Sequence, residues 1–195
     1  MNLWPVLLTL FSLITISLTA EIERVTIKWT PGLCQTSCSK TLQQKLSKMN
    51  GVAEVNFNQD GAEANLRWKP TASFSYANLE STMAQIGLSM DDIRIKARGY
   101  IKHDEKTVTL VSIGDNTRFV LLGPVIPQKS AQVNEYSVYA HPVSPELRTK
   151  LLNAEKANMI AVIEGQLFEP ERSPPLLLIA ENINFVQMQK DNQKQ

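Results

Sequence analysis

The amino-acid sequence predicts an α+β fold, with two helices in its first half and a β-rich second half. Short segments that alternate apolar and polar residues occur along most of the chain and indicate half-buried strands. Two segments of the first half instead carry apolar residues at helical spacing. With 195 residues, of which 43 % are hydrophobic and 20 % charged, the chain is long enough for one large or two small domains.

The first half contains six predicted elements in the order βαββαβ. That order is typical of a split-βαβ, ferredoxin-like sandwich. Gly51 directly follows the first helix and suits its C-cap, and Gly87 ends the second. The elements are a strand at Glu23–Trp29, a helix at Ser37–Asn50, a hairpin of Val52–Phe57 with Ala62–Trp68, a helix at Ser75–Ile86 and a strand at Ile93–Ala97.

The chain's only two cysteines, Cys34 and Cys38, lie where the first strand gives way to the first helix. Unpaired N–H groups and the positive dipole end at a helix N-terminus favour thiolate over thiol. Cu(I) accepts linear or trigonal sulfur coordination, and Hg(II) and Zn(II) also prefer thiolates to oxygen. The pair is therefore a candidate metal site. The alternatives are a structural or redox-active disulfide, and inert thiols, with Cys38 a small core residue in phase with Leu42.

Residues 22–98 resemble the heavy-metal-associated domain, the metal-carrying module of copper chaperones, mercury-binding proteins and metal-pumping ATPases. The resemblance lies in the element order, the cysteine loop, the helix ending in Met49-Asn-Gly-Val52 and the second helix closing on Ile86-Gly87. The family usually shows Gly-Met-x-Cys-x-x-Cys. This chain has Gly32-Leu-Cys34-Gln-Thr-Ser-Cys38, with one more residue between the cysteines and no methionine. The resemblance implies metal transfer by exchange of thiolates between a donor and an acceptor protein.

The second half, residues 99–187, is predicted to be a small barrel of five strands. A short helix around Glu146–Ala154 separates the third strand from the fourth, and this order looks like an OB-type barrel. Such barrels bind oligonucleotides or oligosaccharides through aromatic side chains, and Tyr100, Phe119 and Phe168 are either such side chains or core. The strands are Gly99–Lys102, Thr107–Ile113, Thr117–Leu122, Met159–Phe168 and Leu176–Ile183.

The two ends of the chain differ in composition from the rest of it. Residues 1–20 carry no charged side chain, and the apolar run Leu7–Leu18 ends near Ala20, as in a secretory signal peptide cleaved after that residue. An uncleaved anchor is the alternative, although interspersed Thr and Ser make the run a poor membrane span. Residues 188–195 are expected to be a frayed polar tail. The sequence therefore predicts an extracytoplasmic protein, periplasmic or secreted, in a compartment where unligated thiols tend to oxidise.

Charge and motifs argue against two functional classes. Residues 21–98 carry ten basic and eight acidic side chains, and residues 99–187 carry eight and ten, so neither half has the basic surplus of a nucleic-acid binder. The sequence has no nucleophile elbow, phosphate-binding glycine loop or zinc-protease motif. The only histidines, His103 and His141, stand alone in predicted loops. We therefore expect no enzymatic activity.

The remaining soft and aromatic side chains are predicted to pack rather than bind. Trp29 and Trp68 fall at strand ends, and Met49 and Met83 lie on helix stripes. Met90 is less regularly placed, so a thioether ligand is conceivable there, against a packing role.

The predicted function is binding or transfer of a thiophilic metal, with Cu(I) favoured over Zn or Hg, through Cys34 and Cys38 outside the cytoplasm. Its partners would be the metal ion and a metal-donor or metal-acceptor protein. The alternative is a non-enzymatic interaction or adaptor protein whose two cysteines form a disulfide and bind no metal.

Overall fold

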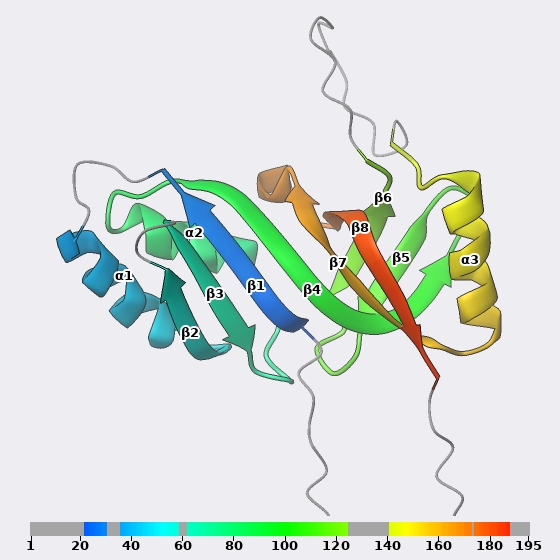
Figure 1. Cartoon of the computed structure of the whole chain (residues 1–195), viewed down its shortest axis with the longest axis horizontal. Helices are drawn as coiled ribbons and strands as arrows, with labels where there is room; N and C mark the ends of the chain where they lie inside the picture. The colour runs from blue at the N-terminus through cyan, green and yellow to red at the C-terminus, as the bar shows by residue number, and fades with distance from the viewer. Residues whose placement is uncertain (1–21, 31–35, 59–61, 125–140, 173, 188–195) are drawn as a thin grey trace, which may run out of the picture.

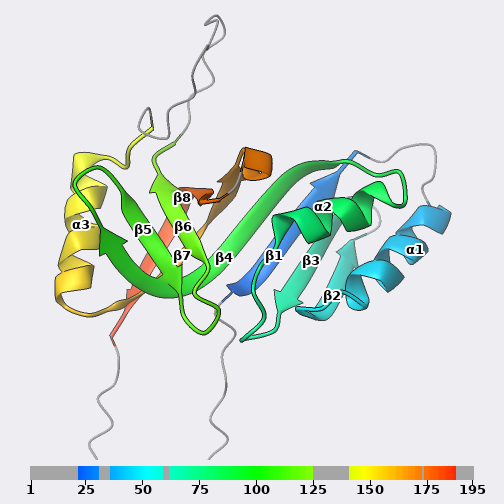
Figure 2. The same cartoon turned by 180° about the vertical axis from the view of Figure 1, so that it is seen from behind.

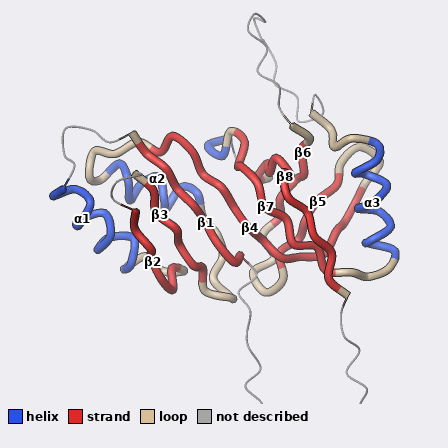
Figure 3. The backbone as a smooth tube through the Cα atoms, viewed as in Figure 1, coloured by secondary structure: helices blue, strands red, loops and turns tan. Residues whose placement is uncertain are grey.

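The computed structural model describes residues 22–30, 36–58, 62–124, 141–172 and 174–187, and within these residues the protein is α+β, as predicted (Figure 1). Its strands form one continuous sheet in the order β2-β3-β1-β4-β5-β6-β8-β7, and a further pairing of β4 with β7 closes its second part. Figure 3 shows the strands as a band along the molecule, with α1 and α2 against one part and α3 beside the other. The elements are β1 (Ile22–Trp29), α1 (Thr36–Ser47), β2 (Val52–Asn58), β3 (Glu63–Trp68), α2 (Tyr76–Ala84), β4 (Met90–His103), β5 (Val108–Ser112), β6 (Arg118–Leu122), α3 (Pro145–Lys156), β7 (Ile160–Phe168) and β8 (Leu176–Val186).

The first part runs from β1 to the beginning of β4 and has the predicted element order βαββαβ. Its strands are antiparallel in the order β2-β3-β1-β4. Leu42 and Leu46 of α1 and Leu79 and Met83 of α2 are buried in one core with the sheet. Figure 2 shows α2 lying over this part of the sheet, with α1 beside it. Each helix thus buries one apolar stripe, as an amphipathic helix on a sheet does.

Local hydrogen bonds fix the ends of α2. The Ser75 hydroxyl accepts a bond of 3.3 Å from the N–H of Asn78, which satisfies one of the unpaired donors of the first turn. At the other end Gly87 adopts a φ of +73°, and the N–H of Leu88 donates to the carbonyl of Met83 at 3.1 Å. A residue in the left-handed region is the usual end of a helix, and glycine reaches it without a Cβ penalty.

The second part is a closed barrel of β4, β5, β6, β8 and β7. All neighbouring strands are antiparallel except β6 and β8, which are parallel. The helix α3 lies between β6 and β7 in the chain, and the Ser144 hydroxyl caps it by accepting from the N–H of Leu147 at 3.2 Å. The five strands and the position of the helix are those predicted for the second half. Membership of the OB class stays a prediction.

The strand β4 belongs to both parts. On one edge, β1 pairs along residues 90–97 and β5 along residues 99–103; on the other edge, β7 pairs along residues 94–100. The predicted domain boundary between residues 98 and 99 therefore lies inside a strand. Where β4 meets β5 the backbones are close, because a Cβ on Gly99 would lie 2.3 Å from the carbonyl oxygen of Val111.

The apolar core continues through both parts of the sheet. Trp68 and Phe119 are among the largest fully buried side chains. Burying an apolar side chain of this kind contributes roughly 1.5–3 kcal/mol. The indole N–H of Trp68 donates to the carbonyl of Ala72 at 2.8 Å, so its polar atom is satisfied within the core. The packing roles predicted for Trp68 and Met83 are thus confirmed.

The predictions for the two ends of the chain concern residues outside the described ranges. The predicted signal peptide covers residues 1–20, and the predicted frayed tail covers residues 188–195. Among the helices that the structure describes, none combines the length and the apolar character needed to cross a bilayer.

The close approach of β7 and β8 at Gly165 is testable. A Cβ at this position would lie 1.7 Å from the carbonyl oxygen of Ile179, beside the irregularity between Glu164 and Gly165. We expect Gly165→Ala to lower the free energy of unfolding by about 3 kcal/mol, because the two backbones must separate. Guanidinium unfolding followed by tryptophan fluorescence measures this change.

Gly87→Ala is the comparison variant. It introduces the same methyl group with nothing within 4 Å, and only its positive φ opposes the change. Its cost should be about 1 kcal/mol. A cost for Gly165→Ala no larger than that of Gly87→Ala would contradict the tight contact.

Candidate functional site

The candidate site is the connection between β1 and α1. β1 ends at Trp29 and α1 begins at Thr36, so the predicted change from strand to helix is present. Cys38 is the third residue of α1, and its backbone lies in the first helical turn, as predicted. Cys34 and the side chains of residues 36–38 lie outside the described parts of the structure. Metal binding by the two cysteines therefore stays a prediction.

The helix that carries Cys38 is fixed to the sheet. Leu42 and Leu46, one and two turns further along, are completely buried in the core. The helix ends at Ser47, three residues before the predicted end at Asn50. The first turn has no acidic residue, so no side-chain carboxylate of that turn opposes the positive end of the helix dipole. The field at the first turn therefore favours a thiolate.

The loop between β1 and α1 starts from a rigid base. Trp29 has only 7 % of its surface exposed, and its ring lies against Phe57 of β2 with the centroids 5.2 Å apart. Its backbone N–H donates to the carbonyl of Ala62 at 3.1 Å. The predicted packing role of Trp29 is confirmed, and the last residue of β1 is held from two sides.

A side-chain hydrogen bond joins the first loop residue to β4. The hydroxyl of Thr30 donates to the Oδ2 atom of Asp91 at 2.6 Å. Met90, beside Asp91, is paired with Trp29 in the strand register, and its side chain is partly buried against the core. This burial supports the packing role of Met90 over that of a thioether ligand.

The described residues add no further ligand cluster to the cysteines. They contain no group of three or more His, Cys, Asp or Glu side chains that could hold a metal ion. His103 contacts the carboxylate of Glu155 through its Nδ1 atom, and the ring of His141 lies edge-on to Phe168 at 6.3 Å. The loop position predicted for His103 is therefore wrong, since it is the last residue of β4, and both histidines contact residues distant in the sequence.

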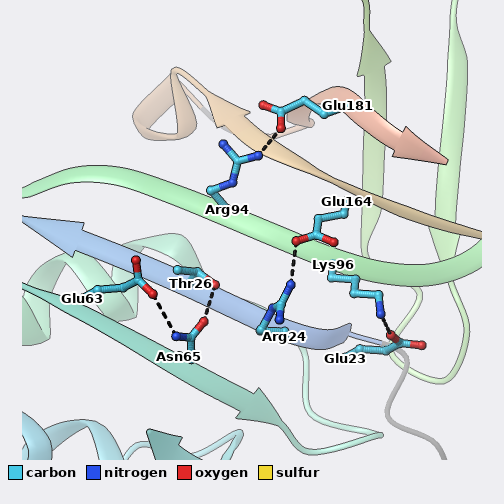
Figure 4. Close-up of polar contacts among 9 residues, drawn as sticks. All are labelled: Glu23, Arg24, Thr26, Glu63, Asn65, Arg94, Lys96, Glu164 and Glu181. Atoms are coloured by element: carbon cyan, nitrogen blue, oxygen red, sulfur yellow. Dashed lines mark hydrogen bonds and ion pairs between the residues drawn. The ribbon is translucent and has the colours of Figure 1, made fainter. Parts of the chain in front are cut away.

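A band of ion pairs lies on the sheet face around β1 and β4, and it was not predicted from the sequence (Figure 4). Arg24 of β1 bonds Glu164 of β7 at 2.6 Å, which spans β4 between them. Arg94 of β4 bonds Glu181 of β8. The alternation Arg94-Ile-Lys-Ala-Arg98 was the available signal, since it places three cations on one face of a strand. The partners of these cations are distant in sequence and could not be predicted.

Glu23 has two cationic partners in this band. Its carboxylate accepts bonds from Lys96 at 2.8 Å and from Arg98 at 2.9 Å. Burial alone would raise the pKa of Glu23, but these hydrogen bonds and the two positive charges outweigh burial and lower it. The ionised form of Glu23 is therefore stabilised in the folded protein.

Three solved structures are similar to part of this chain. Oxidized MerP from Ralstonia metallidurans CH34 is 25 % identical, with 35 % of this chain and 92 % of that chain covered and a TM-score of 0.31. The copper form of a CopA variant from Bacillus subtilis is 18 % identical, with 37 % and 92 % covered and a TM-score of 0.31. A structure concerning crosstalk between Cu(I) and Zn(II) homeostasis is 16 % identical, with 34 % and 93 % covered and a TM-score of 0.30.

No protein-family model and no curated protein matches this chain. Each structural similarity covers about a third of this chain and nearly all of the other chain.

The ion pairs of Glu23 predict a dependence of stability on pH. A carboxyl whose pKa is lowered by folding stabilises the protein above its unfolded pKa of about 4.3, and this stabilisation is lost as the pH falls through the folded pKa. Glu23→Gln should therefore lower the free energy of unfolding at pH 7 by about 1 kcal/mol, a modest value because the pairs are partly exposed to water. The difference from the wild-type protein should shrink steadily below about pH 4. Urea unfolding at a series of pH values measures it.

Glu146→Gln is the matched control for this prediction. Its carboxylate is exposed and bonds Lys150, four residues along α3, which also lowers the pKa of Glu146; because an exposed i,i+4 pair contributes little, this variant should change the free energy of unfolding less than Glu23→Gln does at every pH. A difference for Glu23→Gln that stays constant from pH 7 to pH 3 would show that the ion pairs do not produce the effect.

Proposed function

We propose that this chain binds a soft metal ion, with Cu(I) favoured, through Cys34 and Cys38, and transfers it between proteins outside the cytoplasm without catalysing a reaction. The observation that carries the proposal is the position of Cys38 in the first turn of α1. It comes directly after a short connection that holds the only other cysteine of the chain.

The surroundings of this connection favour sulfur as a ligand. The positive end of the α1 dipole stabilises a thiolate at the first turn, and a thiolate is the form that binds metal. Two thiolates suffice for Cu(I), which accepts linear coordination. Zn(II) and Hg(II) are the other thiophilic candidates.

Two modules would share this function. We assign residues 21–98 to a heavy-metal-associated-like module of the ferredoxin-like class, on the basis of the element order and the antiparallel order β2-β3-β1-β4. We assign residues 99–187 to an OB-like barrel, on the basis of five closed strands, the parallel pair β6–β8 and a helix between the third and fourth strands. The boundary between them lies within β4.

The second candidate function is a metal-free adaptor whose cysteines form a disulfide. An oxidising compartment, as the predicted signal peptide implies, favours a disulfide over two free thiols, and a disulfide leaves no thiolate to bind a metal ion. The redox state of the two sulfur atoms in the native protein separates the two functions.

Metal titration tests the proposal. Reduced protein should bind about one Cu(I) per chain, and Cys34→Ser or Cys38→Ser should largely abolish binding because one sulfur atom cannot hold the ion against a competing thiol or chelator. Competition with a chromogenic Cu(I) chelator measures the stoichiometry and the affinity. Met90→Leu removes the sulfur atom of the residue paired with Trp29 at the end of β1 and should leave both unchanged, since Met90 packs against the core.

A thiol count and elemental analysis on protein isolated without reductant complete the test. Two reactive or metal-protected thiols with stoichiometric metal support metal binding. A protein without titratable thiols and without metal, or a Cys34→Ser variant that binds Cu(I) as tightly as the wild-type protein, would contradict it and favour the adaptor.

A further inference from the structure

A pocket lies between the two parts of the molecule, where β4 and β7 separate. In the described residues the ladder between these strands ends at the pair Arg94–Gln166. Beyond this pair, the beginning of β4 and the end of β7 border a pocket of about 410 Å³, which Tyr76 of α2 also lines. This volume is within the range of small-ligand sites.

The pocket combines an apolar lining with negative charge. Ile93, Leu167 and Phe168 contribute apolar surface from the two strands. Four carboxylates also line it, and no Lys, Arg or His is among its lining residues in the described part of the chain. The carboxylates are Asp91, which accepts the hydrogen bond from Thr30, Asp92, Glu169, which is paired with Arg172 at 3.0 Å, and Glu171.

Asp92 carries a carboxylate oxygen that has no hydrogen-bond partner among the described residues. This oxygen is the Oδ1 atom, and it is buried. The neighbouring cations form their ion pairs with other carboxylates: Lys28, across the strand pair, bonds Glu63 at 3.4 Å, and Arg94 bonds Glu181, although the charge of Arg94 also acts on Asp92. Buried carboxylates are normally paired, because removing the charge from water is costly. A cationic hydrogen-bond donor in the pocket would supply the missing hydrogen bond to Asp92.

The other acidic groups add to this field. Glu171 is exposed at the rim, within the short 3₁₀ helix Pro170–Arg172. Burial, together with the charges of Glu80 and Glu171, raises the pKa of Tyr76 to about 12. The phenol therefore stays neutral, and its ring lines the pocket together with that of Phe168, which His141 contacts edge-on.

We propose that this junction pocket, lined by Tyr76, Asp92, Phe168 and Glu171, binds an organic cation with an apolar stem, namely an amine or a guanidinium. The carboxylates attract the charged group, and the apolar and aromatic lining accommodates the stem, with a cation–π contribution from the rings. An anion would be repelled, and a neutral ligand would not balance the negative charge of the lining. Although four carboxylates line the pocket, no three acidic side chains of the described residues are placed so that they could hold a metal ion. The proposal does not depend on Cys34 or Cys38.

The test uses the full-length protein without metal, at constant ionic strength. It is titrated separately with Nα-acetyl-arginine amide, with the neutral analogue Nα-acetyl-citrulline amide, and with spermidine. Amide NMR shifts at the pocket residues should saturate with a dissociation constant at or below about 1 mM for a cationic probe, and citrulline should bind at least about tenfold more weakly. Tighter binding of the arginine probe points to a side chain of a partner protein. Tighter binding of spermidine points to a free polyamine. Both results support the cation site.

Charge-neutralising variants locate the site. The double variant Asp92→Asn, Glu171→Gln should weaken binding of the cation at least about tenfold. Glu171 is exposed, so Glu171→Gln alone keeps the fold and still tests the charge. Glu146→Gln removes one negative charge, as Glu171→Gln does, but on the distant surface of α3, and it should not change binding.

Three results would overturn the proposal: shifts that do not saturate below about 10 mM, equal binding of the arginine and citrulline probes, or an equal loss of binding in Glu146→Gln. Since the protein is free of metal throughout, none of these results bears on the cysteine site.

Discussion

The rest of the structure depends on a single strand, β4, that has neighbours from both parts of the molecule. Residues 94–97 of β4 pair with β1 on one edge and with β7 on the other, so no separate linker joins the sandwich to the barrel at this point. The ion pair Arg24–Glu164 crosses β4 and joins its two neighbours directly. Because backbone ladders and side-chain pairs act together here, β1 and the barrel are fixed relative to each other. A hinge between the two parts would require breaking these hydrogen bonds.

Local patterns in the sequence predicted the elements well, because each element depends on neighbouring residues. The alternation in Val25-Thr-Ile-Lys-Trp29 marks β1, and the spacing of Leu42 and Leu46 marks α1. The end of α1 was predicted three residues too late, because Gly51 belongs to the turn before β2 rather than to the helix cap. The last strand of the first half was predicted too short, and its continuation was assigned to a separate domain. A local pattern does not show that one strand pairs in both parts of the same sheet.

Features that depend on the tertiary arrangement could not be predicted. Arg24 and Glu164 are 140 residues apart in the chain, and only the order of the strands brings them together. The junction pocket is likewise built from α2, β4, β7 and β8, and its acidic residues occur in two sequence clusters that each look like ordinary solvated polar segments. In the same way, the sequence identified Cys34 and Cys38 as a pair through their proximity in the chain, whereas the role of Met90 became clear only from its burial.

The end of β1, after which the connection to α1 begins, is linked to the lining of the junction pocket, and the two proposed sites differ in chemistry. Thr30, which follows β1, donates its hydroxyl to Asp91 at the beginning of β4, so one hydrogen bond links the base of the cysteine connection to the lining of the pocket. Soft metal ions prefer thiolates, and ammonium or guanidinium groups prefer carboxylates, so the two sites would not compete for a ligand. A cationic side chain of a partner protein held in the pocket would bring that partner close to the end of β1. In the proposed transfer function, metal exchange requires such an approach, because thiolates of both proteins must reach the ion at the same time.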